Sequence, residues 1–255
     1  MEQEKKSPYI LSSLDNALKV LDILSVKDNI SLAEFTRISK LDKTSLFKIL
    51  YTLERRDYVV KTPDAKYRLG VKFVNYGSLV SERQSLAEVA APFMRRLRDR
   101  CRESVYLGVL NANGRVIVMH LEPGTAADSI STRIGFELDA HSSGMGKVLL
   151  AYLDPVMRES LAGSIHYKLY TPETLSGREA LLPVLDEVRT QGSGDDVNER
   201  YPGHSSLAVP VFDRSTHCVA ALSIVCKTEQ YEARRTQLLG ELLDTAQDIS
   251  HKLGY

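Results

Sequence analysis

The sequence predicts an α+β protein: a small N-terminal module of helices and one short hairpin, followed by a larger domain built on an antiparallel sheet. Apolar residues recur with helical periodicity from residue 12 to about residue 56, and a short strand-turn-strand pattern follows. Beyond about residue 85, two longer hairpin patterns alternate with helical segments. A chain of 255 residues, 43% of them hydrophobic, is long enough to form two such domains.

The first helix is expected to begin at Ser12 or Ser13, because either serine suits an N-cap. The polar residues 1–11 before it are expected to be a disordered tail. One side of the helix is predicted to carry its apolar residues: Leu14, Ala17, Leu18, Leu21 and Leu24. This helix would cover the two helices that follow.

Two further helices are joined by a tight turn. The first begins at Ser31, because Ser31 and Glu34 have the spacing of a capping box, and it is predicted to bury Phe35 and Ile38. Asp42 is expected to cap the second. The apolar stripe of this second helix is Leu46, Ile49, Leu50 and Leu53.

The opposite face of the second helix is polar and basic: Thr44, Lys48, Tyr51, Thr52 and Arg55. Such a face is either an ordinary solvated surface or a recognition helix for DNA. Short hydroxyls and a lysine in the first turns favour the recognition helix, because that end enters the major groove. Residues 57–61 and 67–69 have the pattern of two strands, and the residues between them are typical of a turn. This predicts a hairpin with a basic tip after the two helices, which is the wing of a winged helix-turn-helix.

Charge is placed unevenly along a chain whose net charge is zero. The first 76 residues carry 14 Lys and Arg against 10 Asp and Glu, a net charge of +4, so the remainder carries −4. Overall neutrality argues against a protein that coats nucleic acid or an anionic membrane. The basic excess nevertheless lies in the module that is predicted to bind DNA.

Three cysteines, Cys101, Cys218 and Cys226, lie far apart, with no CxxC pair and no clustered histidines. This usage suits a reducing cytoplasm and predicts neither a disulfide framework nor a metal site. The N-terminus lacks the apolar core of a signal peptide, and no run of residues is apolar enough to span a membrane. We therefore expect a cytoplasmic protein without membrane contact, and no motif indicates a cofactor.

The larger domain is predicted from two hairpins, Ser104–Leu110 with Arg115–Leu121 and Ser206–Phe212 with Cys218–Val225. A further strand is expected at Ala127–Arg133. The predicted helices are Leu86–Arg100, Gly144–Leu153, Pro155–Leu161, Ser176–Gln191, and a terminal one with Leu238, Leu242, Ala246, Ile249 and Leu253. Strands interleaved with helices in this way indicate an antiparallel sensor-like domain.

Residues 141–148, His-Ser-Ser-Gly-Met-Gly-Lys-Val, invite comparison with a phosphate-binding loop. The match fails, because His141 replaces the first glycine and Val148 replaces the magnesium-binding hydroxyl. Serines and glycines that open a helix still present backbone N–H groups. The segment is therefore either a seat for a carboxylate or a plain helix cap.

The ordered set of motifs resembles the isocitrate lyase regulator (IclR) family. The first module matches the family at residues 41–54, 57–59 and 67–70. The second domain matches at 141–151, 192–196, Glu199, 207–213 and 219–223. The resemblance implies a winged helix-turn-helix at 12–70, a linker helix at 71–84, and a GAF-like effector-binding and oligomerisation domain at 85–255. It implies a homodimer or a dimer of dimers that binds a pseudo-palindromic, double-stranded operator and regulates a catabolic operon.

Carried over residue by residue, the DNA-binding positions are Lys43, Thr44, Ser45, Phe47, Lys48 and Thr52 on the recognition helix, and Lys66 in the wing. We expect the hydroxyls and Lys43 to contact phosphates, and Lys48 to reach a base edge. Pairing two such modules about one DNA turn apart would supply the contacts that one module lacks.

The resemblance places the effector site at Gly144, Met145, Asp196, His204, Ser206, Ser223 and Val225. Ser206 replaces a cysteine and Val225 replaces a serine of relatives that bind small oxo-acids, so we expect an organic acid bulkier than glyoxylate or pyruvate, either aromatic or sugar-derived. Two alternatives stay open here: Asp196 could cap backbone N–H groups, and His204 could be a structural histidine.

Two rival functions are weighed against this interpretation. A hydrolase could use His141, Ser142, Ser206 and Asp196, but no nucleophile-elbow motif supports it, so we expect no enzyme activity. A metal- or redox-responsive regulator could use Cys218 or Cys226, although cysteines in strands are usually inert core residues.

Overall fold

The computed structural model of the chain describes residues 9–82, 85–125 and 132–255. The chain divides into two compact units, Met1–Arg83 and Gln84–Tyr255. Most of the expected N-terminal tail and most of the strand expected at Ala127–Arg133 lie outside the described residues. No helix in the described part of the chain is long and apolar enough to cross a membrane.

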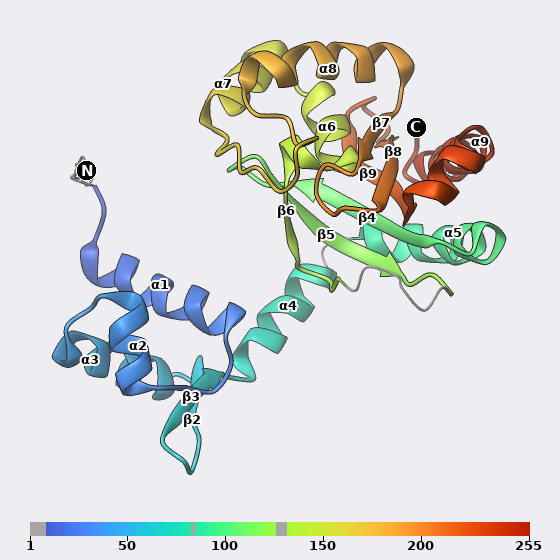
Figure 1. Cartoon of the computed structure of the whole chain (residues 1–255). Helices are drawn as coiled ribbons and strands as arrows, with labels where there is room; N and C mark the ends of the chain where they lie inside the picture. The colour runs from blue at the N-terminus through green and yellow to red at the C-terminus, as the bar shows by residue number, and fades with distance from the viewer. Residues whose placement is uncertain (1–8, 83–84, 126–131) are drawn as a thin grey trace. The chain divides into compact units, whose positions relative to one another are not determined.

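Within residues 9–82, the first unit combines four helices with a small antiparallel sheet (Figure 1). In chain order its elements are α1 (Ser12–Val26), β1 (Ile30–Ser31), α2 (Leu32–Ser39), α3 (Lys43–Glu54), β2 (Val59–Lys61), β3 (Lys66–Leu69) and α4 (Lys72–Glu82). The strand order is β1-β3-β2, so β2 and β3 form the predicted wing. The two-residue strand β1, which the sequence did not predict, extends this sheet at its other edge.

Local capping fixes the helix-turn-helix. The Ser31 hydroxyl accepts a hydrogen bond from the Glu34 amide at 3.3 Å, and the Asp42 carboxylate accepts one from the Ser45 amide at 2.9 Å. Lys40, between the two helices, adopts a left-handed conformation with φ 57°, which ends α2. Both predicted caps are therefore confirmed.

The packing of α1 differs from the prediction in two respects. Its N-cap is Leu11, with no side-chain cap hydrogen bond from Ser12 or Ser13. Leu14 and Leu18 are 56% and 52% exposed, whereas the fully buried residues of this helix are Val20 and Leu24. The apolar residues of α1 cover more than one side, and its contacts with α2, α3 and β3 bury only part of them.

Burial elsewhere in the first unit mostly follows the predicted pattern. Leu46 and Leu50 of α3 are buried with Phe35, and Ile49 and Leu53 are partly buried against the same core. Ile38 is 40% exposed, so its predicted burial is wrong. It lies in the last turn of a helix of eight residues, at the margin of a small core.

The second unit is built on a six-stranded antiparallel sheet with the order β6-β5-β4-β9-β8-β7. Its strands are β4 (Ser104–Leu110), β5 (Arg115–Glu122), β6 (Glu137–Asp139), β7 (Gly194–Val197), β8 (His204–Phe212) and β9 (Cys218–Lys227). Both predicted hairpins are confirmed as the pairs β4 with β5 and β8 with β9. They lie side by side in the middle of the sheet, joined through β4 and β9.

Helices cover the two faces of this sheet (Figure 1). On one face lie α5 (Ser85–Cys101) and α9 (Thr228–Lys252), which form one core with β4, β8 and β9. On the other lie the short helix η1 (Ala140–Ser142), α6 (Gly144–Ala151), α7 (Pro155–Ser164) and α8 (Arg178–Gln191). Every residue of α6 is buried, because α6 packs against both the sheet and α8. The start of α6 is thereby fixed against the sheet.

Candidate functional site

The outward face of α3 is exposed along its length. Lys43, Thr44, Phe47, Lys48 and Thr52 are all solvent-exposed, while Leu46 and Leu50 point into the core. Ser45 is half-buried, and its amide is bound to the cap residue Asp42. A basic, hydroxyl-rich helix face next to a wing has the shape and charge that the major groove and its phosphates require.

An aromatic pair occupies the middle of this face. Phe47 and Tyr51 are 51% and 55% exposed, and their rings stack with centroids 6.4 Å apart. Phe47 was among the expected DNA-binding residues. Tyr51 follows it by four residues, a spacing that puts both rings on the same face of the helix, so the sequence could also have indicated Tyr51 as a DNA-binding residue. Such a pair can make apolar contact with thymine methyl groups or sugars.

The wing carries its charges at the tip of the hairpin. Lys66 forms an ion pair with Asp64 at 2.8 Å, and this lysine, with Thr62, lowers the pKa of Asp64 to about 2. Lys61 and Arg68 are solvent-exposed on the two strands of the wing. Lys66 is therefore at the predicted place, with part of its charge balanced by its neighbour.

The second unit contains a cavity of about 500 Å³, including open solvent at its mouth, above the sheet face that α6 covers. Its lining comes from β4, β6, β7, β8, β9, the start of α6 and the loop after β7: Tyr106, Thr132, Leu138, Ser143, Met145, Asp196, Arg200, Tyr201, His204, Ser205, Ser206, Ser223 and Val225. Carbon atoms make up most of the exposed lining. Largely apolar cavities with a few convergent polar groups are typical binding sites for small organic molecules.

Sheet register explains why distant predicted residues meet at the cavity. Ser206 of β8 pairs with Val225 of β9 on one side and with Asp196 of β7 on the other. Ser223 lies two residues before Val225, so the two side chains share one face of the sheet. The structure thus brings together, around one cavity, all of the predicted effector residues except Gly144: Met145, Asp196, His204, Ser206, Ser223 and Val225.

Gly144 lies at the start of α6, where the first amides have protein acceptors. The Gly144 amide donates to the Ser206 hydroxyl at 3.3 Å, and the Gly146 amide donates to Ser143 at 3.2 Å. The structure therefore shows a helix cap here. Gly146 serves close packing, because a Cβ at this position would lie 2.2 Å from the Cα of Ala140.

Asp196 both caps backbone and lines the cavity. Its carboxylate accepts a hydrogen bond from the Glu199 amide at 2.8 Å, which is the turn-capping role considered from the sequence. Burial is the main cause that raises the pKa of Asp196 to about 7; the hydrogen bond from the Glu199 amide lowers this pKa, and the negative charge of Glu199 raises it. Near neutral pH, Asp196 can therefore be present in a protonated, uncharged form that donates a hydrogen bond.

His204 is half-buried at the edge of the cavity. Its Nδ1 lies 3.4 Å from the carbonyl oxygen of Pro202, and its buried Nε2 has no hydrogen-bond partner among the described residues.

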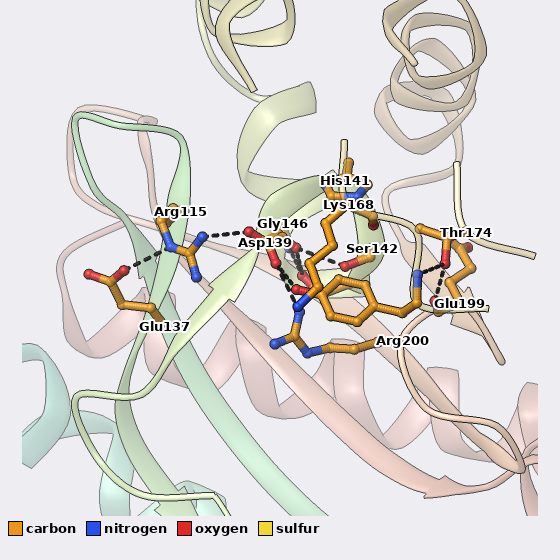
Figure 2. Close-up of polar contacts among 12 residues, drawn as sticks. Arg115, Glu137, Asp139, His141, Ser142, Gly146, Lys168, Thr174, Glu199 and Arg200 are labelled. Carbon is orange, nitrogen blue, oxygen red and sulfur yellow. Dashed lines mark hydrogen bonds and ion pairs between the residues drawn. The ribbon is translucent and has the colours of Figure 1, made fainter. Parts of the chain in front are cut away.

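Arg200 also lines the cavity, and sequence reasoning missed it. Its side chain is only 9% exposed, and Nη1 lies 3.3 Å from Oδ2 of Asp139 (Figure 2). Arg115 binds the other oxygen of Asp139 at 2.5 Å, and the Tyr170 hydroxyl donates to Oδ2. No local pattern in the sequence marks Arg200, because its partners come from distant segments.

The geometry of the rival sites differs from what hydrolysis or thiol chemistry requires. His141 binds the carbonyl of Lys168 at 3.0 Å, and no hydrogen bond joins it to Ser206 or Asp196 in the described part of the chain. Burial raises the pKa of both Cys218 and Cys226 to about 12, so neither is a thiolate at neutral pH. Among the described residues, no group of three His, Cys, Asp or Glu side chains could hold a metal ion.

Both units of the chain match known protein families. Residues 13–63 match the IclR helix-turn-helix domain, and residues 79–251 match the C-terminal domain of IclR bacterial transcriptional regulators. The chain is 31% identical to the transcriptional regulator XynR of Escherichia coli, over 96% of this chain and 98% of XynR. It is 32% identical to KdgR of the same organism, over 98% of this chain and 95% of KdgR.

A solved structure has the same fold. It is an IclR homologue from Microbacterium hydrocarbonoxydans in complex with 4-hydroxybenzoate, with a TM-score of 0.81, 24% identity, and coverage of 94% of this chain and 98% of that one. The family models together match most of the chain, including the helix-turn-helix and the cavity-bearing unit. The chain therefore belongs to the IclR family of bacterial transcriptional regulators.

Proposed function

We propose that an organic acid bulkier than glyoxylate or pyruvate binds in the cavity and sets the affinity of this regulator for its operator. The observation that carries the proposal is the gathering of Met145, Asp196, Ser206, Ser223 and Val225 around one largely apolar cavity. The isopropyl group of Val225 adds apolar surface to the lining, which suits an acid with an apolar body. The complex of the Microbacterium homologue with 4-hydroxybenzoate supports an aromatic acid as one class to test.

The exposed face of α3 and the wing would bind the DNA. Lys43, Thr44 and Ser45 would contact phosphates, and Lys48 would contact a base edge. The protein would act in the cytoplasm as a homodimer or a dimer of dimers on a pseudo-palindromic site in a catabolic operon. A ligand that favours one domain arrangement by about 1–3 kcal/mol would change operator affinity about 5- to 150-fold.

The test is a thermal-shift screen of the full chain against glyoxylate, pyruvate, 4-hydroxybenzoate and D-gluconate. A ligand at about 100 times its dissociation constant stabilises the folded state by roughly 2.7 kcal/mol, which gives a clear rise in melting temperature. We expect at least one bulky acid to give this rise and to change binding to operator duplexes selected from genomic DNA.

Two variants test whether the acid that raises the melting temperature binds in the cavity. Val225→Phe should fill the cavity and abolish the shift, whereas Val156→Phe, at a position 79% exposed on α7, should leave it unchanged. If glyoxylate alone binds, the proposed effector class is wrong. An unchanged shift in Val225→Phe would place the acid outside the cavity.

A further inference from the structure

We propose that Arg200 receives the carboxylate of the effector and determines the preference of the cavity for acids. This inference rests on the proposed function, because it assigns a residue to the cavity where the acid would bind. Arg200 lines that cavity with a side chain that is nine-tenths buried. Arginine presents a planar fork of donors that matches a carboxylate, which makes it the preferred residue for buried acid recognition.

The guanidinium of Arg200 has a hydrogen-bond donor that no described residue uses. Its ion pair with Asp139 is long, at 3.3 Å, while Arg115 holds the same carboxylate at 2.5 Å. The Nε atom of Arg200 is buried and has no hydrogen-bond partner among the described residues. Buried donors in folded proteins are nearly always satisfied, so an unpaired Nε on a side chain of the cavity lining supports a ligand oxygen as its acceptor. Because Nε is closed to solvent in this structure, the guanidinium must turn to present it to the ligand.

Neighbouring groups hold the guanidinium in place. Its carbon lies 4.6 Å from the ring centroid of Tyr170 and 5.5 Å from that of Tyr201, within the range of cation–π contact. Figure 2 shows Asp139 between the two arginines, with Arg115 on one side and Arg200 on the other. The rings and Asp139 orient Arg200, and the Tyr201 ring itself belongs to the cavity lining.

The start of α6 is a weaker candidate for holding the acid in this chain. Ser206 and Ser143 accept hydrogen bonds from the Gly144 and Gly146 amides, and the Lys147 amide donates to the Ser143 carbonyl at 3.0 Å. These three amides would have to exchange a partner before they could bind a ligand, whereas the Met145 amide between them has no acceptor among the described residues. Nε of Arg200 has no hydrogen-bond partner to exchange among the described residues, and the guanidinium carries a full positive charge.

The test compares an acid with its neutral analogue by calorimetry on the full chain. The probe pairs are 4-hydroxybenzoate with 4-hydroxybenzamide, and D-gluconate with D-gluconamide. Wild-type protein should bind the acid of at least one pair more tightly than the amide. Arg200→Gln should lose about 10- to 100-fold in affinity for that acid and change its affinity for the amide by less than about threefold.

Arg115→Gln is the matched control, because Arg115 pairs with the same Asp139 without lining the cavity. This variant should keep the preference for the acid. Equal acid affinity in Arg200→Gln and wild type would overturn the inference while leaving the proposed function intact, and so would an equal loss in Arg115→Gln. Wild-type protein that binds neither acid would overturn the proposed function and this inference with it.

A second measurement avoids any folding defect in the variants. Phenylglyoxal modifies arginine side chains, and mass spectrometry of the wild-type protein gives the rate at the peptide that contains Arg200. Saturating acid should slow modification of Arg200 at least about fivefold and leave the exposed Arg96 unaffected. Modification of Arg200 at the same rate with and without bound acid would overturn the assignment.

Discussion

Lys147 and Glu199 form a buried ion pair that ties α6 to the loop after β7. The lysine side chain is 3% exposed and the glutamate side chain 11% exposed, and the same ammonium donates to the Asp195 carbonyl at 2.8 Å. Burial raises the pKa of Glu199, and the positive charge of Lys147 acts in the opposite direction. The pair thereby holds the segment that carries Asp196 and Arg200 against the start of α6.

Lys147→Met should destabilise the protein by about 3–5 kcal/mol, because it leaves a buried carboxylate without its cation. The measurement is urea denaturation followed by circular dichroism. The double variant Lys147→Met/Glu199→Gln removes both charges and should recover a large part of the loss. A single variant as stable as wild type would mean that the pair contributes nothing net.

Asp196→Asn should reduce the loss of folding stability that occurs as the pH rises. The folded-state pKa of Asp196 is raised to about 7 from an ordinary value of 3.8, so between these values the folded state holds a proton that the unfolded state has lost. Stability therefore falls as pH rises through this window, and the loss from Asp196 is nearly complete above pH 8.

Between pH 5.5 and pH 8, the deprotonation of Asp196 should lower the free energy of unfolding of the wild-type protein by roughly 2 kcal/mol. Asparagine does not titrate, so Asp196→Asn should not show this loss, and its side-chain oxygen can still accept the hydrogen bond from the Glu199 amide. Melting temperatures of both proteins at the two pH values test this. Parallel pH curves for wild type and Asp196→Asn would contradict it.

Lys48→Ala should weaken operator binding by about 1–3 kcal/mol and leave oligomeric state unchanged, because Lys48 is exposed on the face of α3 opposite the core. Gel-shift titration gives the affinity, and analytical ultracentrifugation gives the assembly. Lys19→Ala on α1, where the lysine pairs with Asp15 at 2.8 Å, is the control and should bind DNA like wild type. Equal affinities for Lys48→Ala and wild type would remove Lys48 from the interface.

Phe47→Ala should separate DNA binding from stability. Phe47 is 51% exposed, so its removal should change the free energy of unfolding by no more than about 1 kcal/mol while weakening operator binding. Phe35 is fully buried in the same unit, and Phe35→Ala should cost about 3–5 kcal/mol. If Phe47→Ala binds DNA with wild-type affinity, the aromatic pair with Tyr51 has no role in recognition.

The sequence by itself determined the features that depend on neighbours a few residues apart. Ser31 and Asp42 cap α2 and α3 through amides three residues along the chain, so their spacing was sufficient to place both helices. The two hairpins of the second unit followed from alternating strands around short turns, where Gly114 adopts φ 71°.

Only the tertiary structure decided which groups meet over long separations. Leu14 and Leu18 are exposed because the partners of α1 cover a different part of its surface. The Gly144 amide donates to the hydroxyl of Ser206, 62 residues away, a contact that no pattern in residues 141–148 could indicate. Arg200 reaches the cavity beside Asp139 from 61 residues along the chain. Periodicity and spacing describe one segment at a time, whereas these contacts depend on how separate segments pack together.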